Sequence, residues 1–250
     1  MTLPDSFLTR PIAHRGLHDV DAGRAENSPA AIAAALDAGY AIEIDLQMSS
    51  DAVPMVFHDY DLGRLTDETG AITMRTAKEL RQIPLRHDGG GIPTLQDVLT
   101  QVAGKVPLLI EMKDQDGQMG PNIGPMGQAV ADILRGYSGD YALMSFNPHM
   151  IAQMRDLLPD APRGIVTDHY NAKSWGYLPE HIRDSLRDIP DYDRTGASFI
   201  SHNQADLSAA PVARLKERGA VILCWTVKSA KVEKTARQVA DNITFEGYLA

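Results

Sequence analysis

Short apolar runs recur along the chain, and stretches with helical spacing separate them. Eight of these runs have the length and the β-branched content of strands: residues 11–16, 41–48, 107–113, 141–146, 163–167, 198–202, 220–227 and 242–248. Strands that alternate with helices predict a parallel sheet, because parallel neighbours need long crossover connections. Eight such units in 250 residues match an α/β fold of the TIM (β/α)8 barrel type, so we predict a single barrel domain over residues 1–250.

The segments between the runs carry helix start and stop signals. Ser28-Pro29 supplies an N-cap serine and a proline for the first turn, and Gly39 supplies a stop. Evidence of this kind predicts helices over residues 30–38, 95–103, 148–158, 208–218 and 229–240. An open doubly wound sheet is the main alternative, but the runs lack the glycine-rich phosphate fingerprint typical of that fold.

One further strand breaks the alternation. Residues 53–58 have a strand pattern, yet they follow within a few residues of the run that ends at Met48. A parallel crossover needs about a dozen or more residues. We therefore expect this strand to turn back antiparallel after the second barrel strand and to bring His58 toward Glu43 and Asp45.

A small insertion follows from the same reasoning. Residues 49–93 show no regular alternation of strands and helices, apart from a helical piece at 76–82, and they contain a glycine stretch at 89–91. A lid or a wall of the substrate site is the functional interpretation of this segment, and a plain surface excursion is the alternative.

Composition and charge exclude several classes of protein. Hydrophobic residues make up 44% and charged residues 23%, as in ordinary globular proteins. The formal net charge of -9 argues against a general nucleic-acid binder, although a local positive site or a metal can still bind phosphate.

Cys224 is the single cysteine, which excludes an internal disulfide and indicates a packed thiol. The sequence shows no signal-peptide pattern and no apolar run of membrane-spanning length, so we expect a cytoplasmic protein.

Two carboxylates one residue apart carry the strongest chemical signal. Glu43 and Asp45 occupy positions i and i+2 of an otherwise apolar strand, so both side chains face the same way. Their repulsion makes burial costly unless a cation lies between them. Glu111 ends another apolar run and completes an all-oxygen set, which hard divalent cations such as Mg²⁺ or Ca²⁺ prefer. A half-exposed strand with a polar face is the alternative. Zinc would require histidine or cysteine ligands, and we find none spaced for it.

Two histidines reach this predicted site by separate routes. His14 ends the first run, and His58 lies on the returning strand. Two histidines beside a metal suit general acid and base catalysis near neutral pH, whereas a lone histidine at a strand end is more often structural. The other histidines lack such companions, and we predict that they are structural or surface residues: His18, His87, His149, His169, His181 and His202. His149 and His202 are the exceptions to consider among them, because they follow strand ends.

Two cations lie beside these groups in the sequence. Arg15 offers a planar fork suited to phosphate. Lys113 offers a positive charge to an anionic substrate, or else an ion pair to Glu111 or Asp114.

Four more residues are candidates for substrate contacts. Glu26 and Asn27 precede the first helix, so N-capping and reaching into the site are both open to them. Phe146 and Trp225 come at the ends of strands, where they belong either to the core or to an apolar wall for the substrate.

Together these residues resemble the glycerophosphodiester phosphodiesterase family. The matching motifs follow the family's order and cover nearly the whole chain: His14-Arg15-Gly16, Glu26-Asn27-Ser28, Glu43-Ile44-Asp45-Leu46, Val56-Phe57-His58-Asp59, Ile92-Pro93-Thr94-Leu95, Glu111-Met112-Lys113, Ser145-Phe146 and Trp225-Thr226-Val227. Any one triplet is weak, but the ordered set is specific.

The resemblance implies a TIM barrel, a divalent metal held by the three carboxylates, acid–base roles for the two histidines, and phosphate contacts from Arg15 and Lys113. It implies cleavage of a small-molecule glycerophosphodiester to glycerol 3-phosphate and an alcohol, with no membrane contact required. We assign His14 as base and His58 as acid. Water and the substrate's own 2-hydroxyl both stay open as the nucleophile. Residues 241–247 lack the family's usual glycine-rich ending with a Thr-Asp pair, and we expect this difference to leave the metal and acid–base residues untouched.

Three alternatives come from other classes. A metal-independent phosphodiesterase of the phospholipase C type conflicts with three carboxylates. A non-catalytic phosphodiester-binding barrel conflicts with the retention of both histidines. A glycosidase built on a carboxylate pair leaves the histidines and the arginine without a role.

Overall fold

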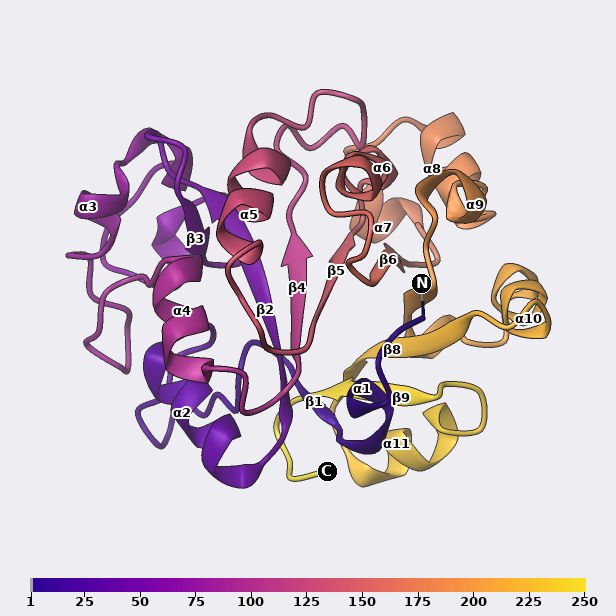
Figure 1. Ribbon diagram of the computed structural model, residues 1–250, viewed down its shortest axis with the longest axis horizontal. Helices are drawn as coiled ribbons and strands as arrows, with labels where there is room; N and C mark the ends of the chain where they lie inside the picture. Colours follow the sequence, from indigo (N-terminus) through magenta and orange to yellow (C-terminus); the bar gives the residue numbers. More distant parts are fainter. Residues whose placement is uncertain (1) are drawn as a thin grey trace.

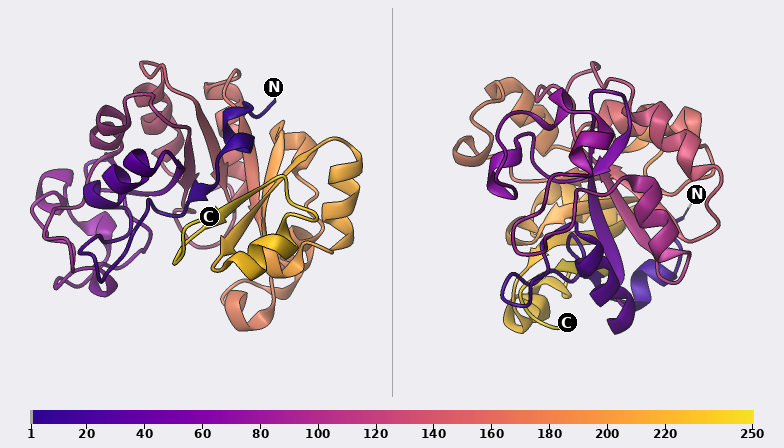
Figure 2. Two further views of the ribbon diagram at one scale, coloured as in Figure 1. Left: turned by 90° about the horizontal axis from the view of Figure 1, so that it is seen from below. Right: turned by 90° about the vertical axis from the view of Figure 1, so that its left-hand side faces the viewer.

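Eight parallel strands close into a barrel in the computed structural model, which describes residues 2–250 (Figure 1). The barrel strands are β1 (Ile12–Ala13), β2 (Ala41–Met48), β4 (Leu108–Met112), β5 (Tyr141–Ser145), β6 (Arg163–Thr167), β7 (Phe199–Asn203), β8 (Val221–Val227) and β9 (Asn242–Phe245). The barrel closes because β1 pairs in parallel with both β2 and β9, which brings the first and the last strand side by side (Figure 2). All eight predicted strands and the TIM barrel fold are confirmed.

The predicted antiparallel strand is also confirmed. β3 (Pro54–Val56) pairs antiparallel with the carboxyl end of β2, with Leu46 opposite Val56. The rest of the segment between β2 and β4 has an apolar core of its own, which includes Phe57, Leu62 and Ile72. This core anchors the insertion beside the barrel strand that carries the acidic residues.

Helices pack on the outside of the strands (Figure 1). They are α1 (Ser6–Thr9), α2 (Pro29–Ala38), α3 (Ala77–Leu80), α4 (Leu95–Val102), α5 (Met126–Leu134), α6 (Pro148–Leu157), α7 (Ala172–Trp175), α8 (Glu180–Arg187), α9 (Tyr192–Thr195), α10 (Ala210–Glu217) and α11 (Ala230–Ala236). The five predicted helices appear as α2, α4, α6, α10 and α11, and the helical piece in the insertion appears as α3. None of the helices in residues 2–250 is both long and apolar enough to cross a membrane.

Five helices were not predicted, α1, α5, α7, α8 and α9. α5 follows Pro125, which makes no side-chain cap, so its start carries no capping signal. α8 has only two apolar residues, Ile182 and Leu186, and both are only partly buried, so its apolar face is narrow.

Alternate residues of the strands fill the barrel interior. One apolar layer there is formed by Ile12, Ala41, Leu109, Ala142, Met144, Val166, Phe199 and Leu223. The intervening residues, such as Ile44 and Ile110, belong to the larger core between strands and helices. Because inward positions recur every second residue, the interior rows continue from Ala41 to Glu43 and Asp45 on β2, and from Leu109 to Glu111 on β4.

Gly164 leaves room in this interior for the ring of Phe199. A methyl group added at Gly164 would overlap that ring. We predict that Gly164→Ala lowers the free energy of unfolding by about 1–3 kcal/mol, the usual effect of overpacking a core. Urea denaturation measures this. Gly120→Ala is the matched control, because an added methyl there meets nothing within 4 Å; its effect should stay within about 0.5 kcal/mol. Equal effects of the two changes would contradict the prediction.

Candidate active site

Three carboxylates from neighbouring strands meet at the carboxyl end of the barrel. Asp45 on β2 lies directly opposite Glu111 on β4 in the strand register, and Glu43 precedes Asp45 on the same inward row. Glu43 and Asp45 are each 1% exposed, and Glu111 is 6% exposed. One oxygen of each residue lies within 4.8 Å of the other two. Sequence spacing alone therefore located this cluster.

The cluster fits a hard divalent cation. The Oε1 atom of Glu43 is buried and has no hydrogen-bond partner within residues 2–250. Burial, together with the charges of Asp45 and Glu111, raises the pKa of Glu43 well above its ordinary value. A carboxylate that is penalised in this way, within an all-oxygen set, is relieved by a cation such as Mg²⁺ or Ca²⁺. Glu43, Asp45 and Glu111 are the residues that could hold it.

Lys113 and Arg15 already neutralise part of this negative charge. The Nζ atom of Lys113 lies 2.7 Å from Oδ1 of Asp45 and 2.5 Å from Oε1 of Glu111. The Nε atom of Arg15 lies 3.2 Å from Oδ2 of Asp45. Burial acts to raise the pKa of Asp45, but the charges of Lys113 and Arg15 outweigh it and hold the pKa well below its ordinary value. The predicted ion pair of Lys113 with Glu111 is confirmed, and its second partner is Asp45, not Asp114.

The loop after β1 has a backbone that only certain residues adopt. Arg15 has φ of 54° and Gly16 has φ of 78°. A Cβ at Gly16 would also lie 2.9 Å from the carbonyl carbon of Ala31, so glycine is required twice over. This turn directs the backbone N–H of Arg15 to Oε2 of Glu43 at 2.9 Å.

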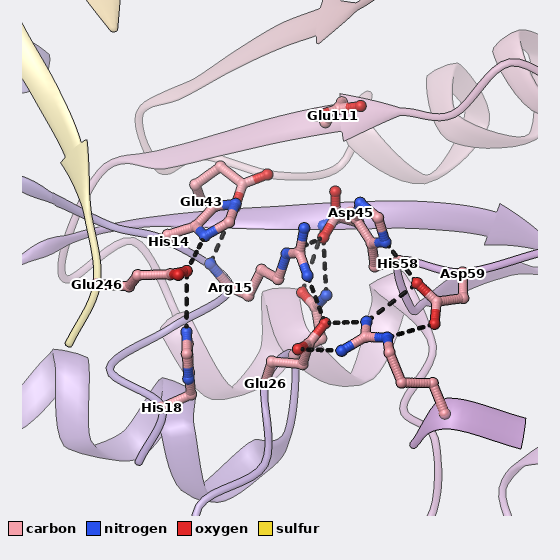
Figure 3. Close-up of polar contacts among 12 residues, drawn as sticks. His14, Arg15, His18, Glu26, Glu43, Asp45, His58, Asp59, Glu111 and Glu246 are labelled. Atoms are coloured by element: carbon pink, nitrogen blue, oxygen red, sulfur yellow. Dashed lines mark hydrogen bonds and ion pairs between the residues drawn. The ribbon is translucent and has the colours of Figure 1, made fainter. Parts of the chain in front are cut away.

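Asn27 forms a hydrogen bond with Asp45, and Glu26 forms one with Arg15. The Nδ2 atom of Asn27 donates to Oδ2 of Asp45 at 2.9 Å, and Asn27 itself has φ of 59°. Glu26 accepts from Nη1 of Arg15 at 2.6 Å and also from Arg64 of the insertion (Figure 3). The role of these two residues as substrate contacts stays a prediction.

His14 is held by a residue that the sequence motifs do not contain. Its Nδ1 atom lies 2.5 Å from Oε2 of Glu246, which directly follows β9, and Figure 3 shows that carboxylate between His14 and His18. Burial lowers the pKa of His14, so the ring is neutral near pH 7. A carboxylate only accepts, so Nδ1 carries the proton and Nε2 keeps its lone pair.

Contrary to expectation, the segment of residues 241–247 therefore does contact a predicted acid–base residue, His14. His18 is also more than a plain surface residue, because its Nε2 atom lies 3.4 Å from Glu246. Donor atoms of His14, His18 and Glu246 lie within 4.8 Å of one another, so this fold does bring together a group of possible metal ligands that includes histidines. The alternation Asn242, Thr244, Glu246 on the last inward row is the signal that could have identified Glu246.

His58 has a carboxylate partner of its own. Its Nδ1 atom lies 2.6 Å from Oδ1 of Asp59, and Asp59 also accepts from Nε of Arg64 at 2.6 Å. Burial acts to raise the pKa of Asp59, but hydrogen bonds from His58 and Arg64 outweigh it and lower the pKa. The Asp59 carboxylate therefore fixes the orientation of the His58 ring through its Nδ1 atom.

The aromatic candidates come from strands other than those that carry the histidines. Phe146 directly follows β5, Trp225 lies on β8, and their ring centroids are 5.5 Å apart. Both rings are partly exposed. Of the two remaining exceptions, His202 is buried between Thr167 and Asp206, and the backbone N–H of His149 joins the cap of α6.

Known proteins resemble this chain over nearly its whole length. A profile of the Glycerophosphoryl diester phosphodiesterase family matches residues 14–242. YhdW of Bacillus subtilis (strain 168), whose name assigns it provisionally to the glycerophosphodiester phosphodiesterases, is 28% identical over 229 residues, which cover 88% of this chain and 86% of the relative.

Solved structures resemble the fold. A phosphodiesterase from Oleispira antarctica, in complex with the product sn-glycerol-3-phosphate, superposes with a TM-score of 0.76 at 24% identity, over 96% of this chain and 94% of the other. A glycerophosphodiester phosphodiesterase from Agrobacterium tumefaciens str. C58 superposes with a TM-score of 0.68 at 24% identity, over 95% of this chain and 96% of the other.

Glu43 gives a direct test of the metal cluster. Because its folded-state pKa is raised, its ionisation destabilises the metal-free protein as pH rises above the ordinary value of 4.5. We predict that Glu43→Gln stabilises the metal-free protein, that this gain grows with pH above 4.5, and that saturating Mg²⁺ or Ca²⁺ reverses it. Thermal unfolding in EDTA and in each metal, over a pH series, measures the effect.

The control for this experiment is Glu217→Gln, which removes an exposed carboxylate of α10. It should change neither the pH dependence nor the response to metal. A difference between wild type and Glu43→Gln that is independent of both pH and metal would rule out the cation-binding interpretation of the cluster.

Proposed function

The chain belongs to the glycerophosphoryl diester phosphodiesterase family, and we propose that it hydrolyses glycerophosphodiesters to sn-glycerol 3-phosphate and an alcohol by metal-dependent catalysis with two histidines. Membership makes the chain an enzyme of the phosphoric diester hydrolase type. The observation that carries the proposal is the meeting of two carboxylate-paired histidines with a buried cluster of three carboxylates and two cations.

We expect the phosphate group of the substrate to lie beside the metal cluster of three carboxylates. Mg²⁺ or Ca²⁺ bound by Glu43, Asp45 and Glu111 would supply Lewis-acid neutralisation of the phosphate charge. Arg15 and Lys113 add fixed positive charge on the same side, which favours the more highly charged transition state. That the bacterial relative of known structure binds sn-glycerol-3-phosphate supports a substrate of this size and charge.

His14 and His58 perform different proton transfers in this proposal. His14 is neutral and presents Nε2, so it accepts the proton of the nucleophile. His58, with Asp59 behind it, donates a proton to the leaving alkoxide. The 2-hydroxyl of the glycerol and a water molecule are both compatible nucleophiles with this assignment.

The proposed substrate is small and charged, so neither a membrane nor a nucleic acid is needed as a partner. The single-domain organisation and the cytoplasmic location stay predictions.

The proposed mechanism makes activity depend on the metal and on both histidines. We expect glycerol 3-phosphate release from glycerophosphodiesters in Mg²⁺ or Ca²⁺, loss of this release in EDTA, and a fall of about 10²-fold or more in kcat for His14→Ala and for His58→Ala. His202→Asn is the matched control, because it removes a buried imidazole outside the site. Near-normal turnover by both catalytic variants would overturn the two-histidine mechanism.

Glu246 provides a second prediction, about the orientation and charge of His14. Glu246→Ala removes the acceptor that fixes the proton on Nδ1, so we expect kcat to fall by about 10²-fold or more with a smaller effect on KM. The same carboxylate raises the pKa of His14 against the effect of burial, so its loss should move the acid limb of kcat/KM to lower pH. The pH profile of kcat/KM measures both effects.

Lys228→Met is the control for this change. Lys228 is the exposed partner of Glu246, at 2.6 Å from Oε1, and has no contact with His14. It should alter kcat by only a few-fold. A Glu246→Ala variant that loses stability but keeps the wild-type pH profile would give Glu246 a structural role alone.

A further inference from the structure

A second cluster of metal-ligand side chains lies on the Nδ1 side of the His14 ring. Nδ1 of His14 lies 2.5 Å, and Nε2 of His18 lies 3.4 Å, from the same carboxylate oxygen, Oε2 of Glu246. Figure 3 shows this carboxylate between the two rings. We call His14, His18 and Glu246 the histidine cluster. The catalytic steps proposed above make no use of His18.

The donor atoms of the histidine cluster nearly have the spacing of a zinc site. Zn²⁺ binds imidazole nitrogen and carboxylate oxygen at about 2.0–2.2 Å, so two ligands of a tetrahedral site lie about 3.4 Å apart. The contact between His18 and Glu246 already has that length. The contact between His14 and Glu246 would have to lengthen from 2.5 Å, as expected when a metal takes the place of a shared proton. One donor atom of each residue lies within 4.8 Å of the other two.

The closure of the barrel holds the backbone of the histidine cluster in place. The backbone N–H of His14 donates to the carbonyl of Phe245 at 2.9 Å, which ties the first barrel strand to the last. Glu246 follows Phe245 directly, and its own N–H donates to the carbonyl of Val227 at 3.0 Å. The residues on both sides of His18 also donate backbone hydrogen bonds. A metal would therefore need only small side-chain adjustments.

The donor set of the histidine cluster selects a different cation from that of the three carboxylates. Two imidazoles and one carboxylate are the protein ligands of several catalytic zinc sites. Mg²⁺ and Ca²⁺ prefer oxygen ligands, which Glu43, Asp45 and Glu111 offer without any nitrogen. The two clusters therefore suit two different classes of divalent cation.

Solvent reaches the histidine cluster from one side. The side chains of His14, His18 and Glu246 are 14%, 20% and 17% exposed. His18 borders a surface cavity of about 590 Å³, which is lined by residues 17–21, 24 and 247–249. Lys228 pairs with Oε1 of Glu246 at 2.6 Å and is 67% exposed, so it leaves Oε2 to the two rings and can move aside. A cation can therefore enter, and a water molecule from the cavity can complete a tetrahedral set.

We propose that His14, His18 and Glu246 bind Zn²⁺ or a similar transition-metal ion, and that this ion inhibits the enzyme by occupying Nδ1 of His14. A neutral imidazole carries one proton, so the proton that Nδ1 shares with Glu246 has to move to Nε2 when the metal binds. His18 binds through Nε2 and keeps its proton on Nδ1. A His14 ring protonated at Nε2 has no lone pair there to accept the proton of the nucleophile. The metal site is independent of the proposed function, whereas the inhibition rests on it.

Titration with Zn²⁺ measures the site directly, in a protein whose three carboxylates are saturated with Mg²⁺. We expect isothermal titration calorimetry to show one equivalent of Zn²⁺ bound to the wild-type protein, and His18→Ala to weaken the affinity by at least about 10-fold. His181→Ala is the matched control, because it removes an exposed imidazole of α8. Equal affinities of the wild-type protein and His18→Ala would overturn the proposal.

Co²⁺ supplies a spectroscopic readout, since it takes the ligands that Zn²⁺ takes and absorbs visible light strongly when it is four-coordinate. We expect this absorption in the wild-type protein and its loss in His18→Ala and in Glu246→Ala. Glu43→Gln should keep it, because that change lies in the other cluster. Lys228→Met should keep it too, because it removes only the cation at Oε1. An absorption that is lost in Glu43→Gln alone would place the ion at the three carboxylates and overturn the proposal.

Kinetics test the inhibition. In saturating Mg²⁺, we expect Zn²⁺ to lower the kcat of the wild-type protein by about 10²-fold or more, as removal of the base does. His18→Ala should keep its Mg²⁺-supported activity at the same Zn²⁺ concentration. An unchanged kcat in a protein whose histidine cluster holds Zn²⁺ would overturn the inhibition.

The two proposals fail in different ways. Zn²⁺ binding that depends on His18, in a protein that hydrolyses no glycerophosphodiester, supports the metal site and contradicts the proposed function. Mg²⁺-supported turnover by a protein that binds no Zn²⁺ supports the proposed function and overturns the metal site.

Discussion

Mutual repulsion among three buried carboxylates is the constraint around which the rest of the site is arranged. Glu43, Asp45 and Glu111 lie within 4.8 Å of one another at their oxygens, in a place that water hardly reaches. Lys113 and Arg15 offset this repulsion and in doing so become fixed beside it. Removing either cation would leave buried charge without a partner, which is far more damaging than losing a surface ion pair. The groups that keep the site folded are therefore the same groups that we propose to bind the cation and the phosphate.

The period of a β-strand turns that constraint into a working surface. Inward positions recur every second residue, so the row that contains Ala41 continues into the acidic pair, and corresponding rows end in His14, Phe146, Trp225 and Glu246. Eight strands of one barrel deliver these side chains to one end. The cationic groups follow β1 and β4, whereas the aromatic groups follow β5 or lie on β8.

Local patterns in the sequence account for the strands and the acidic cluster, because both depend on residues close together in the chain. The antiparallel return of β3 followed from connection length alone. Glu246 was not predicted, because its partner His14 lies 232 residues away in the sequence and a contact between such distant residues depends on barrel closure. α5 escaped because Pro125 gives its start no side-chain cap. The contacts of Asp168 depend on donors from three separate elements, which spacing does not reveal.

Arg64 decides whether the insertion acts as a lid or as a wall. It binds both oxygens of Glu26 and both oxygens of Asp59, and these carboxylates in turn hold Arg15 and His58. Arg64 is 48% exposed, so each bond taken alone contributes little to stability. Together they join the insertion to Arg15 and to His58 through charge-assisted bonds with fixed geometry. Moving the insertion away would release both side chains, so this arrangement favours a wall of the site over a lid that opens for each substrate.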